Sequence, residues 1–413
     1  MQILRIRGGK PLEGTIHISG AKNAALPVLA ACVLFSDVCR VENCPDLLDV
    51  DAALDILRHL GAQCIREGDC ITVDPRTSSR WEIPEALMQR MRGSVFFLGP
   101  LMARFGRCTL AMPGGCPLGK RPVDYHVNGL QTMGAVFEPG EDILSCRGKL
   151  KGARIALPYP SVGATENLLM AALGASGETT IENTAREPEI CCLCDFLRSG
   201  GCRISGDGTS VIRVLPGLPG KGKIKLIPDR METATYLCAA ASAGGRVRLQ
   251  ACCPAHLDSV IEIMRKAGCV IACEQNAMTV YADGLMSPGC IETGPYPAFP
   301  TDAQAPLMAA VLMAKGECRI RERVFSQRMH HIPALQSMGA MIALHGTQAV
   351  ITGRKKLFGA KVTATDLRGG AALTVAALGA SGETEISGLG HLLRGYEDIA
   401  GKLRALGADC SFG

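Results

Sequence analysis

The chain has 413 residues, 47% of them hydrophobic and 20% charged, and its 44 basic and 39 acidic side chains leave a net charge of +5. This length is enough for two or three domains, and the composition excludes disordered, collagen-like and coiled-coil proteins. We expect no nucleic-acid partner, because the charge is small and scattered, and no membrane insertion, because the apolar runs are well short of the ~20 residues that span a bilayer.

Six copies of one pattern follow each other along the chain. Each copy contains a predicted helix that ends in a small or apolar residue, then glycine, then a small residue, and the glycines are Gly61, Gly134, Gly201, Gly268, Gly339 and Gly407. Each glycine suits the left-handed position just past a helix C-terminus. The surrounding pattern reads helix, strand, helix, strand, strand, which predicts six α/β units of about 70 residues with their helices packed under the sheets. The units suggest two domains of three, with Pro and Gly clustered at residues 216–220 after the third.

Cations stand where several of these helices are predicted to begin. A helix N-terminus carries partial positive charge, so a basic side chain there is unfavourable by about 0.3–1 kcal/mol. The repeated exceptions are Lys22, Arg92, Arg121, Arg230, Arg368 and Arg394. Any one of them can be a solvated surface charge, but the set favours helix starts and side chains that converge on bound anions.

The segment 113–122 has three glycines and three prolines around Cys116, which argues against a core role for this thiol. Lys120 and Arg121 lie nearby and favour the thiolate, so we interpret Cys116 as a functional thiol, with an incidental loop cysteine as the alternative.

The other cysteines of the 20 do not form a recognisable metal motif. Cys191 and Cys194 lie on a predicted helix over 189–198 without a second pair at zinc spacing, and the tandem His330 and His331 also fall on a predicted helix, where neighbours point apart. The first residues carry no apolar signal core, so we expect a cytoplasmic protein with reduced, mostly buried thiols. We expect no metal and no cofactor, since dinucleotide and phosphate-loop motifs are missing.

Two aspartates open predicted helices among these cations. Asp302 follows Thr301, and Asp366 precedes Leu367 and Arg368. Each can be a helix cap, or an acid or base whose pKa is set by the surrounding charge.

Several of these segments together resemble the UDP-N-acetylglucosamine 1-carboxyvinyltransferase family. The resemblance is collinear over essentially the whole chain and is carried by residues 20–23, 113–124, 161–165, 185–189, 228–230, 299–302, 364–368 and 394–397. The cysteine loop separates it from the related shikimate-pathway synthase.

The resemblance implies an α/β fold of two inside-out barrel domains, the enolpyruvyl transferase fold, each with three βαβαββ-type units. The implied domains are 22–229, with the cysteine loop at about 112–122, and 1–21 plus 230–413. The implied reaction transfers the enolpyruvyl group of phosphoenolpyruvate to the 3-hydroxyl of UDP-N-acetylglucosamine through a tetrahedral ketal and releases phosphate. It is the first committed step of peptidoglycan precursor synthesis, and it needs no cofactor. The two substrates are the implied partners, and the implied enzyme is a monomer or weak oligomer.

The resemblance also implies roles for individual residues. Cys116 would protonate the methylene carbon and be the thiol alkylated by fosfomycin, Asp302 would be the base, and Asp366 would line the closed site. The phosphoenolpyruvate ligands would be Lys22, Arg92, Arg121 and Arg394, of which Lys22 and Arg394 would also be catalytic. The UDP-N-acetylglucosamine ligands would be Asn23, Arg92, Arg121, Pro122, Val123, Asp124, Ser161, Val162, Gly163, Asp302, Val324, Arg328 and Arg368.

Two positions depart from the family pattern. Leu48 and Tyr159 stand where the family often has lysines that face substrate phosphates. They are the only support for an enzyme of the same fold with a different acceptor hydroxyl. A regulator that binds the sugar nucleotide without turnover is the other alternative, and the intact Cys116, Asp302 and Arg394 argue against it.

Overall fold

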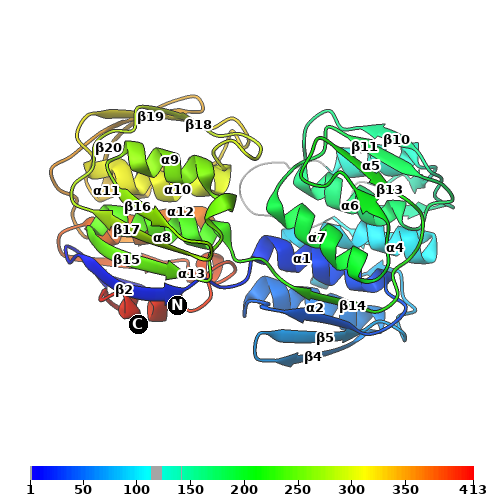
Figure 1. Ribbon diagram of the computed structural model, residues 1–413. Coiled ribbons are helices and arrows are strands. Elements are labelled where there is room, and N and C mark those ends of the chain that lie inside the picture. Colours follow the sequence, from blue (N-terminus) through cyan, green and yellow to red (C-terminus); the bar gives the residue numbers. More distant parts are fainter. Residues whose placement is uncertain (1, 113–122, 141) are drawn as a thin grey trace. The chain divides into compact units, whose positions relative to one another are not determined.

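A computed structural model describes residues 2–112, 123–140 and 142–413, which form two compact units (Figure 1). The C-terminal unit consists of residues 2–19 and 228–413, and the N-terminal unit consists of the described residues between 20 and 227. Within the described residues the chain passes from one unit to the other after Ser19 and returns after Ile227.

The described part of each unit contains three four-stranded sheets with one shared topology. In the sheet β18-β19-β21-β20, the first two strands are parallel and the other neighbours antiparallel. Its chain order is β18 (Cys290–Glu292), α10 (Thr301–Ala310), β19 (Glu317–Arg321), α11 (Ile332–Ser337), β20 (Met341–His345) and β21 (Gln348–Thr352). This βαβαββ order confirms the predicted type of repeat.

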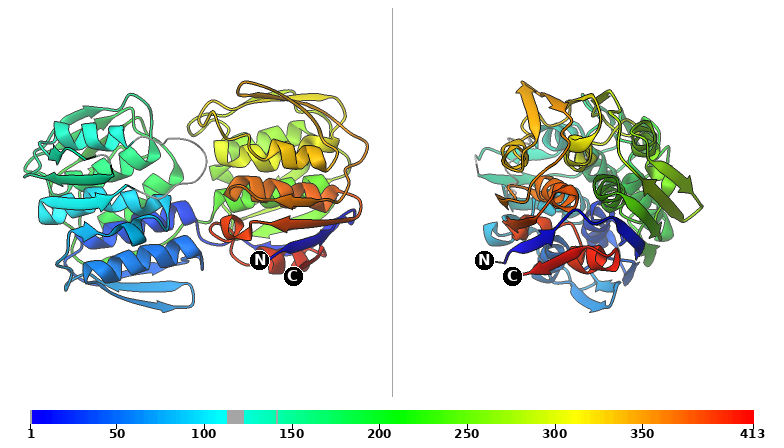
Figure 2. Two further views of the ribbon diagram at one scale, coloured as in Figure 1. Left: turned by 180° about the vertical axis from the view of Figure 1, so that it is seen from behind. Right: turned by 90° about the vertical axis from the view of Figure 1, so that its left-hand side faces the viewer.

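The other two sheets of the C-terminal unit each include a strand from the start of the chain. β1 (Leu4–Arg7) lies between β23 (Glu383–Ser387) and β24 (Asp409–Phe412), and β2 (Leu12–His17) pairs in parallel with β15 (Gly245–Gln250). The chain ends lie side by side in this unit, where Ile3 and Gly413 exchange backbone hydrogen bonds (Figure 2). The remaining elements are α8 (Arg230–Ala243), β15 (Gly245–Gln250), α9 (Asp258–Lys266), β16 (Val270–Cys273), β17 (Ala277–Ala282), β22 (Lys361–Thr363), α12 (Leu367–Gly379), β23 (Glu383–Ser387), α13 (Leu389–Leu392), α14 (Ile399–Ala405) and β24 (Asp409–Phe412).

The N-terminal unit repeats the plan with its first strand supplied late in the chain. β14 (Gly222–Lys225) follows the Pro and Gly cluster at 216–220 and pairs in parallel with β3 (Cys39–Glu42). The first two repeats contain α1 (Lys22–Ala31), α2 (Leu48–Leu60), β4 (Gln63–Glu67), β5 (Cys70–Asp74), β6 (Glu82–Ile83), α3 (Glu85–Met88), η2 (Arg92–Phe97), α4 (Leu98–Phe105), β7 (Arg107–Ala111), α5 (Asp124–Thr132), β8 (Val136–Glu138) and β9 (Ile143–Arg147). The third contains β10 (Arg154–Ala156), α6 (Val162–Ala172), β11 (Thr179–Glu182), α7 (Pro188–Ser199), β12 (Ile204–Ser205) and β13 (Val211–Val214).

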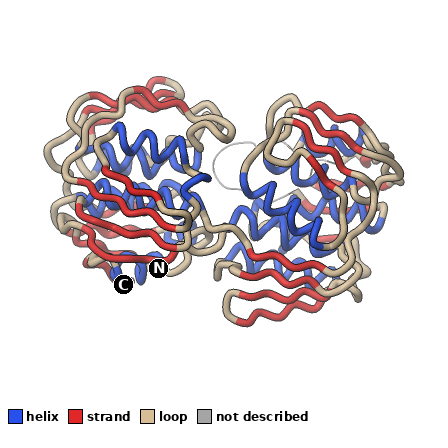
Figure 3. Tube along the Cα trace, in the orientation of Figure 1, coloured by secondary structure: helices blue, strands red, loops and turns tan. Residues whose placement is uncertain are grey.

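Helices form the inside of each unit and the sheets form its outside (Figure 3). In the C-terminal unit α8, α10 and α12 pack against one another, and nearly every residue along α8 and α12 is buried. A helix that is buried on all sides belongs to a core centre, whereas strands such as β1 alternate buried and exposed side chains. The six repeat glycines all have positive φ, between 83° and 103°, as the pattern predicts.

Two helix predictions differ from the structure. His330 and His331 precede α11, which begins only at Ile332 with Pro333 in its first turn, where proline is favoured. Arg394 does not open a helix but lies in the turn between α13 and α14, and Asp398 caps α14 by accepting the Gly401 N–H at 3.0 Å.

Candidate functional site

The predicted site residues fall into two sets, one in each unit. Cys116, Arg121 and Pro122 lie outside the described residues.

Asp302 is the centre of the set in the C-terminal unit. It is the second residue of α10, and its carboxylate accepts hydrogen bonds from the guanidinium groups of Arg328 and Arg368, the latter at 2.8 Å. Both arginines are buried, whereas the Asp302 side chain keeps 24% of its surface exposed. The aspartate makes no helix-capping hydrogen bond, so the cap alternative is wrong for this residue. The arrangement presents an accessible carboxylate held in place by two buried cations.

The charges around Asp302 fix its protonation state. Burial alone would raise the pKa of its carboxyl group, but Arg368 and Arg328 outweigh burial and hold that pKa well below its ordinary value. The same contact raises the pKa of Arg368 against the effect of burial. Asp302 is therefore an ionised hydrogen-bond acceptor throughout the neutral range.

Asp366 has a different position at the start of α12. Its Oδ1 accepts the backbone N–H groups of Arg368 and Gly369, each at 2.9 Å, so the cap interpretation is confirmed here. By capping the helix, Asp366 fixes the backbone from which the Arg368 side chain reaches Asp302. His331 is buried against the same helix start, because Gly369 leaves room for it: a Cβ atom there would lie 3.3 Å from the His331 Cβ.

Polar groups extend the cluster on both sides of Asp302. Arg368 donates to the Tyr396 hydroxyl at 3.2 Å, and Tyr396 shares a 2.8 Å hydrogen bond with Thr235 on α8. On the other side, Arg328 donates to the Thr301 hydroxyl at 3.0 Å. Tyr396 and Thr301 were not predicted as site residues, although each lies within two residues of one. Val324 lies in the turn after β19, and Arg394 is partly exposed in its turn.

Lys22 leads the set in the N-terminal unit. As the first residue of α1, it places its ammonium group 2.6 Å from the carboxylate of Asp49 at the start of α2, and both side chains are largely buried. The neighbouring Asn23 is exposed, and Leu48 beside Asp49 is 53% exposed. Sequence reasoning missed the role of Asp49, because an acidic residue in the first turn of a helix is ordinary.

A second group of the N-terminal unit gathers where α5 and α6 begin. Asp124 and Val162 are the first residues of these helices, Val123 precedes α5, and Ser161 caps α6 by accepting the Ala164 N–H at 3.4 Å. Gly163 allows close approach to α5, since a Cβ there would lie 3.3 Å from the His126 ring.

His126 is buried in this group and was also missed. Burial, and then the charge of Arg92, lower its pKa to about 4. Its Nδ1 lies 3.0 Å from the Asn167 Nδ2. The Asn167 Oδ1 accepts the Gly99 N–H at 2.7 Å, which orients the amide so that Nδ2 donates to a neutral imidazole. His126 is thus an uncharged, oriented imidazole, and the charge of Arg92, the first residue of η2, helps to keep it neutral.

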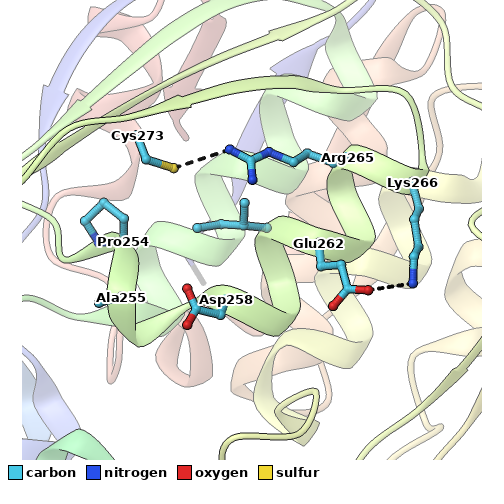
Figure 4. A pocket seen from close by; sticks show the side chains of 8 residues that line it. Pro254, Ala255, Asp258, Glu262, Arg265, Lys266 and Cys273 are labelled. Carbon is cyan, nitrogen blue, oxygen red and sulfur yellow. Dashed lines mark hydrogen bonds and ion pairs between the residues drawn. The ribbon is translucent and has the colours of Figure 1, made fainter.

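A shallow groove of about 800 Å³ lies elsewhere on the C-terminal unit and contains none of the predicted residues (Figure 4). Its walls come from the outer side of α9 and the end of β16, with Arg265 3.8 Å from the Cys273 sulfur. Among the described residues, no three His, Cys, Asp or Glu side chains are grouped so as to hold a metal ion.

Comparison with known proteins assigns the chain to a family. A family model described as EPSP synthase (3-phosphoshikimate 1-carboxyvinyltransferase) matches residues 6–403. The chain is 45% identical, over 99% of each chain, to a Solidesulfovibrio magneticus protein named UDP-N-acetylglucosamine 1-carboxyvinyltransferase. A Synechocystis protein of the same name is also 45% identical, over 98% of this chain and 94% of its own. The chain belongs to the UDP-N-acetylglucosamine 1-carboxyvinyltransferase family. The resemblance that the sequence motifs indicated is confirmed.

Solved structures agree with this assignment. The crystal structure of the enolpyruvyl transferase NikO from Streptomyces tendae is similar with a TM-score of 0.90 and 26% identity, over 100% of this chain and 98% of that one. EPSP synthase from Acinetobacter baumannii has a TM-score of 0.74 at 20% identity, over the whole of both chains, and shows the fold alone. The predicted enolpyruvyl transferase fold is confirmed. In the part of the chain that the structure describes, no helix is long and apolar enough to cross a membrane.

Proposed function

We propose that this family member transfers the enolpyruvyl group of phosphoenolpyruvate to the 3-hydroxyl of UDP-N-acetylglucosamine and releases phosphate. The reaction takes place in the cytoplasm and commits the sugar nucleotide to peptidoglycan synthesis. The observation that carries the proposal is the partly exposed Asp302 carboxylate between two buried arginines, in a chain 45% identical to a protein with this activity in its name.

In this proposal the acceptor hydroxyl binds to Asp302 and Asn23. The hydroxyl oxygen adds to C2 of phosphoenolpyruvate and gives its proton to Asp302, while Cys116 donates a proton to the methylene carbon C3. The product of this step is a tetrahedral ketal. In the second step the Cys116 thiolate takes a proton from C3, the double bond forms again, and the C2–O bond to phosphate breaks. Because Asp302 is already ionised, its main contribution is to orient and polarise the hydroxyl.

The cations of the site stabilise the anionic substrate and the departing phosphate. We assign Lys22, Arg92, Arg121 and Arg394 to phosphoenolpyruvate. The sugar-nucleotide residues are Asn23, Arg92, Arg121, Pro122, Val123, Asp124, Ser161, Val162, Gly163, Asp302, Val324, Arg328 and Arg368. Asp366 supports the sugar-nucleotide residues indirectly, because it caps α12 and so fixes the start of the helix that carries Arg368.

Phosphate release with both substrates tests the proposal. We expect turnover that depends on phosphoenolpyruvate and on UDP-N-acetylglucosamine, a large loss of turnover in Cys116→Ser, and inactivation of the wild type by fosfomycin. Cys273→Ser is the matched control, because it changes an exposed thiol away from the predicted residues. If UDP-N-acetylglucosamine does not support turnover, the acceptor assignment is wrong; if fosfomycin still inactivates Cys116→Ser, the thiol assignment is wrong.

A further inference from the structure

Glu322 is a buried carboxylate with no role in the proposed mechanism. It follows β19 directly, and only 1% of it is exposed. Four donors surround it: Oε1 accepts from the Thr293 hydroxyl at 2.8 Å and from the N–H groups of Val324 and Phe325 at 2.8 and 3.0 Å, and Oε2 accepts from the Thr301 hydroxyl at 2.9 Å. Both oxygens of this buried carboxylate are therefore held by donors, three on Oε1 and one on Oε2.

The first arm of this network holds the turn after β19. With their N–H groups bound to one oxygen, Val324 and Phe325 have a fixed backbone. The same turn leads to Arg328, whose N–H is bound to the Phe325 carbonyl at 2.9 Å. Glu322 therefore determines where the Arg328 side chain begins.

A second part of this hydrogen-bond network connects Glu322 to Arg328 through Thr301. Arginine can only donate, so the Thr301 hydroxyl must accept from Arg328 Nη1 at 3.0 Å and use its single proton toward Glu322. The same Arg328 nitrogen donates to Asp302. Arg328 thus donates toward both carboxylates, directly to Asp302 and through the Thr301 hydroxyl to Glu322.

We propose that Glu322 is a positioning residue for the acceptor side of the reaction, acting through Thr301 and through the turn at Val324 on the Arg328–Asp302 pair. The expected effect on turnover of UDP-N-acetylglucosamine rests on the proposed function, whereas the expected effect on the backbone at Val324 and Phe325 does not. Because the network contacts Asp302 and Val324, which we assign to the sugar nucleotide, its loss should affect UDP-N-acetylglucosamine far more than phosphoenolpyruvate.

Thr301→Val is the decisive variant, since it keeps the shape of the side chain and removes only the hydroxyl. We expect kcat/KM for UDP-N-acetylglucosamine to fall at least tenfold and KM for phosphoenolpyruvate to stay within twofold, with Thr301→Ser close to wild type. The matched control is Thr374→Val, which removes a buried hydroxyl that donates at 3.0 Å to a carbonyl of its own helix, α12. It should change neither constant more than twofold.

Glu322→Gln and the double variant Glu322→Gln/Thr301→Val test whether both residues act on one path. We expect the double variant to be no more than about twofold worse than the poorer single variant. Additive losses, equal effects on the two substrates, or equal losses in Thr301→Val and Thr374→Val would each overturn the proposal.

Amide hydrogen exchange separates this proposal from the proposed function, because it needs no substrate. Glu322→Ala should accelerate exchange at the Val324 and Phe325 amides at least tenfold relative to wild type, and Thr374→Val should not. Unchanged exchange at these amides would disprove the positioning role even in an active enzyme. Accelerated exchange in a protein that does not turn over UDP-N-acetylglucosamine would retain the network and reject the reaction.

Discussion

The two units share one repeat topology but hold their predicted site residues by different means. In the C-terminal unit a carboxylate lies between two buried arginines, and further hydrogen bonds reach Tyr396 and Thr301. In the N-terminal unit Lys22 forms an ion pair with Asp49. The neutral His126 lies in the first turn of α5 and is hydrogen-bonded to Asn167 of α6. The helix starts therefore hold a carboxylate between two arginines in one unit and a lysine–aspartate pair in the other.

The comparison shows which residue types tolerate such positions. A helix start attracts anions, so Asp302 and Asp366 are compatible with it, whereas Lys22 needs the Asp49 carboxylate as a partner. The group of Arg328, Asp302 and Arg368 has two positive charges and one negative charge. The variants below change one side of this comparison at a time.

Asp302→Asn should have the largest effect. It leaves two buried guanidinium groups without their carboxylate and removes the acceptor of the hydroxyl proton, so we expect kcat to fall about 100- to 10,000-fold. Since the pKa of Asp302 lies well below its ordinary value, the wild-type rate should show no acid limb from this group between pH 5 and 8. Asp409→Asn is the control, because this exposed acid forms a 3.7 Å ion pair with Lys10 and does not belong to the Asp302 cluster. A loss of kcat below tenfold would show that the held carboxylate is not the base.

Much of the fold could be predicted because its signals are local. The six glycines mark helix ends through their own backbone conformation, and the period of their spacing gives the number of repeats. The strand that completes the first repeat could not be found in this way. β14 lies about 180 residues after β3, and its pairing depends on the whole unit closing.

The same distinction between local and long-range signals applies to the candidate site. Lys22 and Asp302 could be selected from their own positions at helix starts, but their partners could not, since Asp49 and Arg328 belong to other elements. His126 resembles any helical histidine until Asn167 is placed beside it. Asp366 shows a further limit, because one residue can cap a helix and still support the site.

His126→Gln should change the acid stability of the N-terminal unit. In the folded chain the pKa of His126 is lowered to about 4, so between roughly pH 4 and 6.5 the unfolded chain binds the proton more strongly. The contribution of neutral His126 to the free energy of unfolding is therefore fully present above pH 6.5. It is lost as the pH falls toward 4, and the total loss is about 3 kcal/mol. Urea unfolding followed by Trp81, the single tryptophan and part of this unit, measures it. The variant should lose less stability than wild type on acidification, whereas the exposed His345→Gln should behave like wild type; equal slopes for both variants would contradict the prediction.

Glu232→Gln should show the opposite dependence in the C-terminal unit. Burial raises the pKa of Glu232 to about 7, although Lys402 at 2.6 Å lowers it. The folded chain therefore binds this proton more strongly than the unfolded chain, and its contribution is lost as the pH rises from about 4.5 through 7, by about 3 kcal/mol at most. Hydrogen exchange of the α8 amides at pH 5 and 8 reports it. The change in stability between pH 5 and pH 8 should be smaller in the variant than in the wild type. An unchanged pH dependence would assign the proton to another group.

Asp49→Asn should have the smallest effect, and it tests the Lys22–Asp49 pair directly. It keeps the shape of the side chain but removes the charge that holds the Lys22 ammonium at 2.6 Å. Because we assign Lys22 to phosphoenolpyruvate, kcat/KM for that substrate should fall about tenfold, equivalent to ~1.4 kcal/mol, while KM for UDP-N-acetylglucosamine changes less than twofold. Thr301→Val should give the reverse preference, so the two variants form a matched pair measured by the same phosphate-release assay. If both variants affect the same substrate, either the assignment of Lys22 to phosphoenolpyruvate or the assignment of the Arg328–Asp302 pair to the sugar nucleotide is wrong.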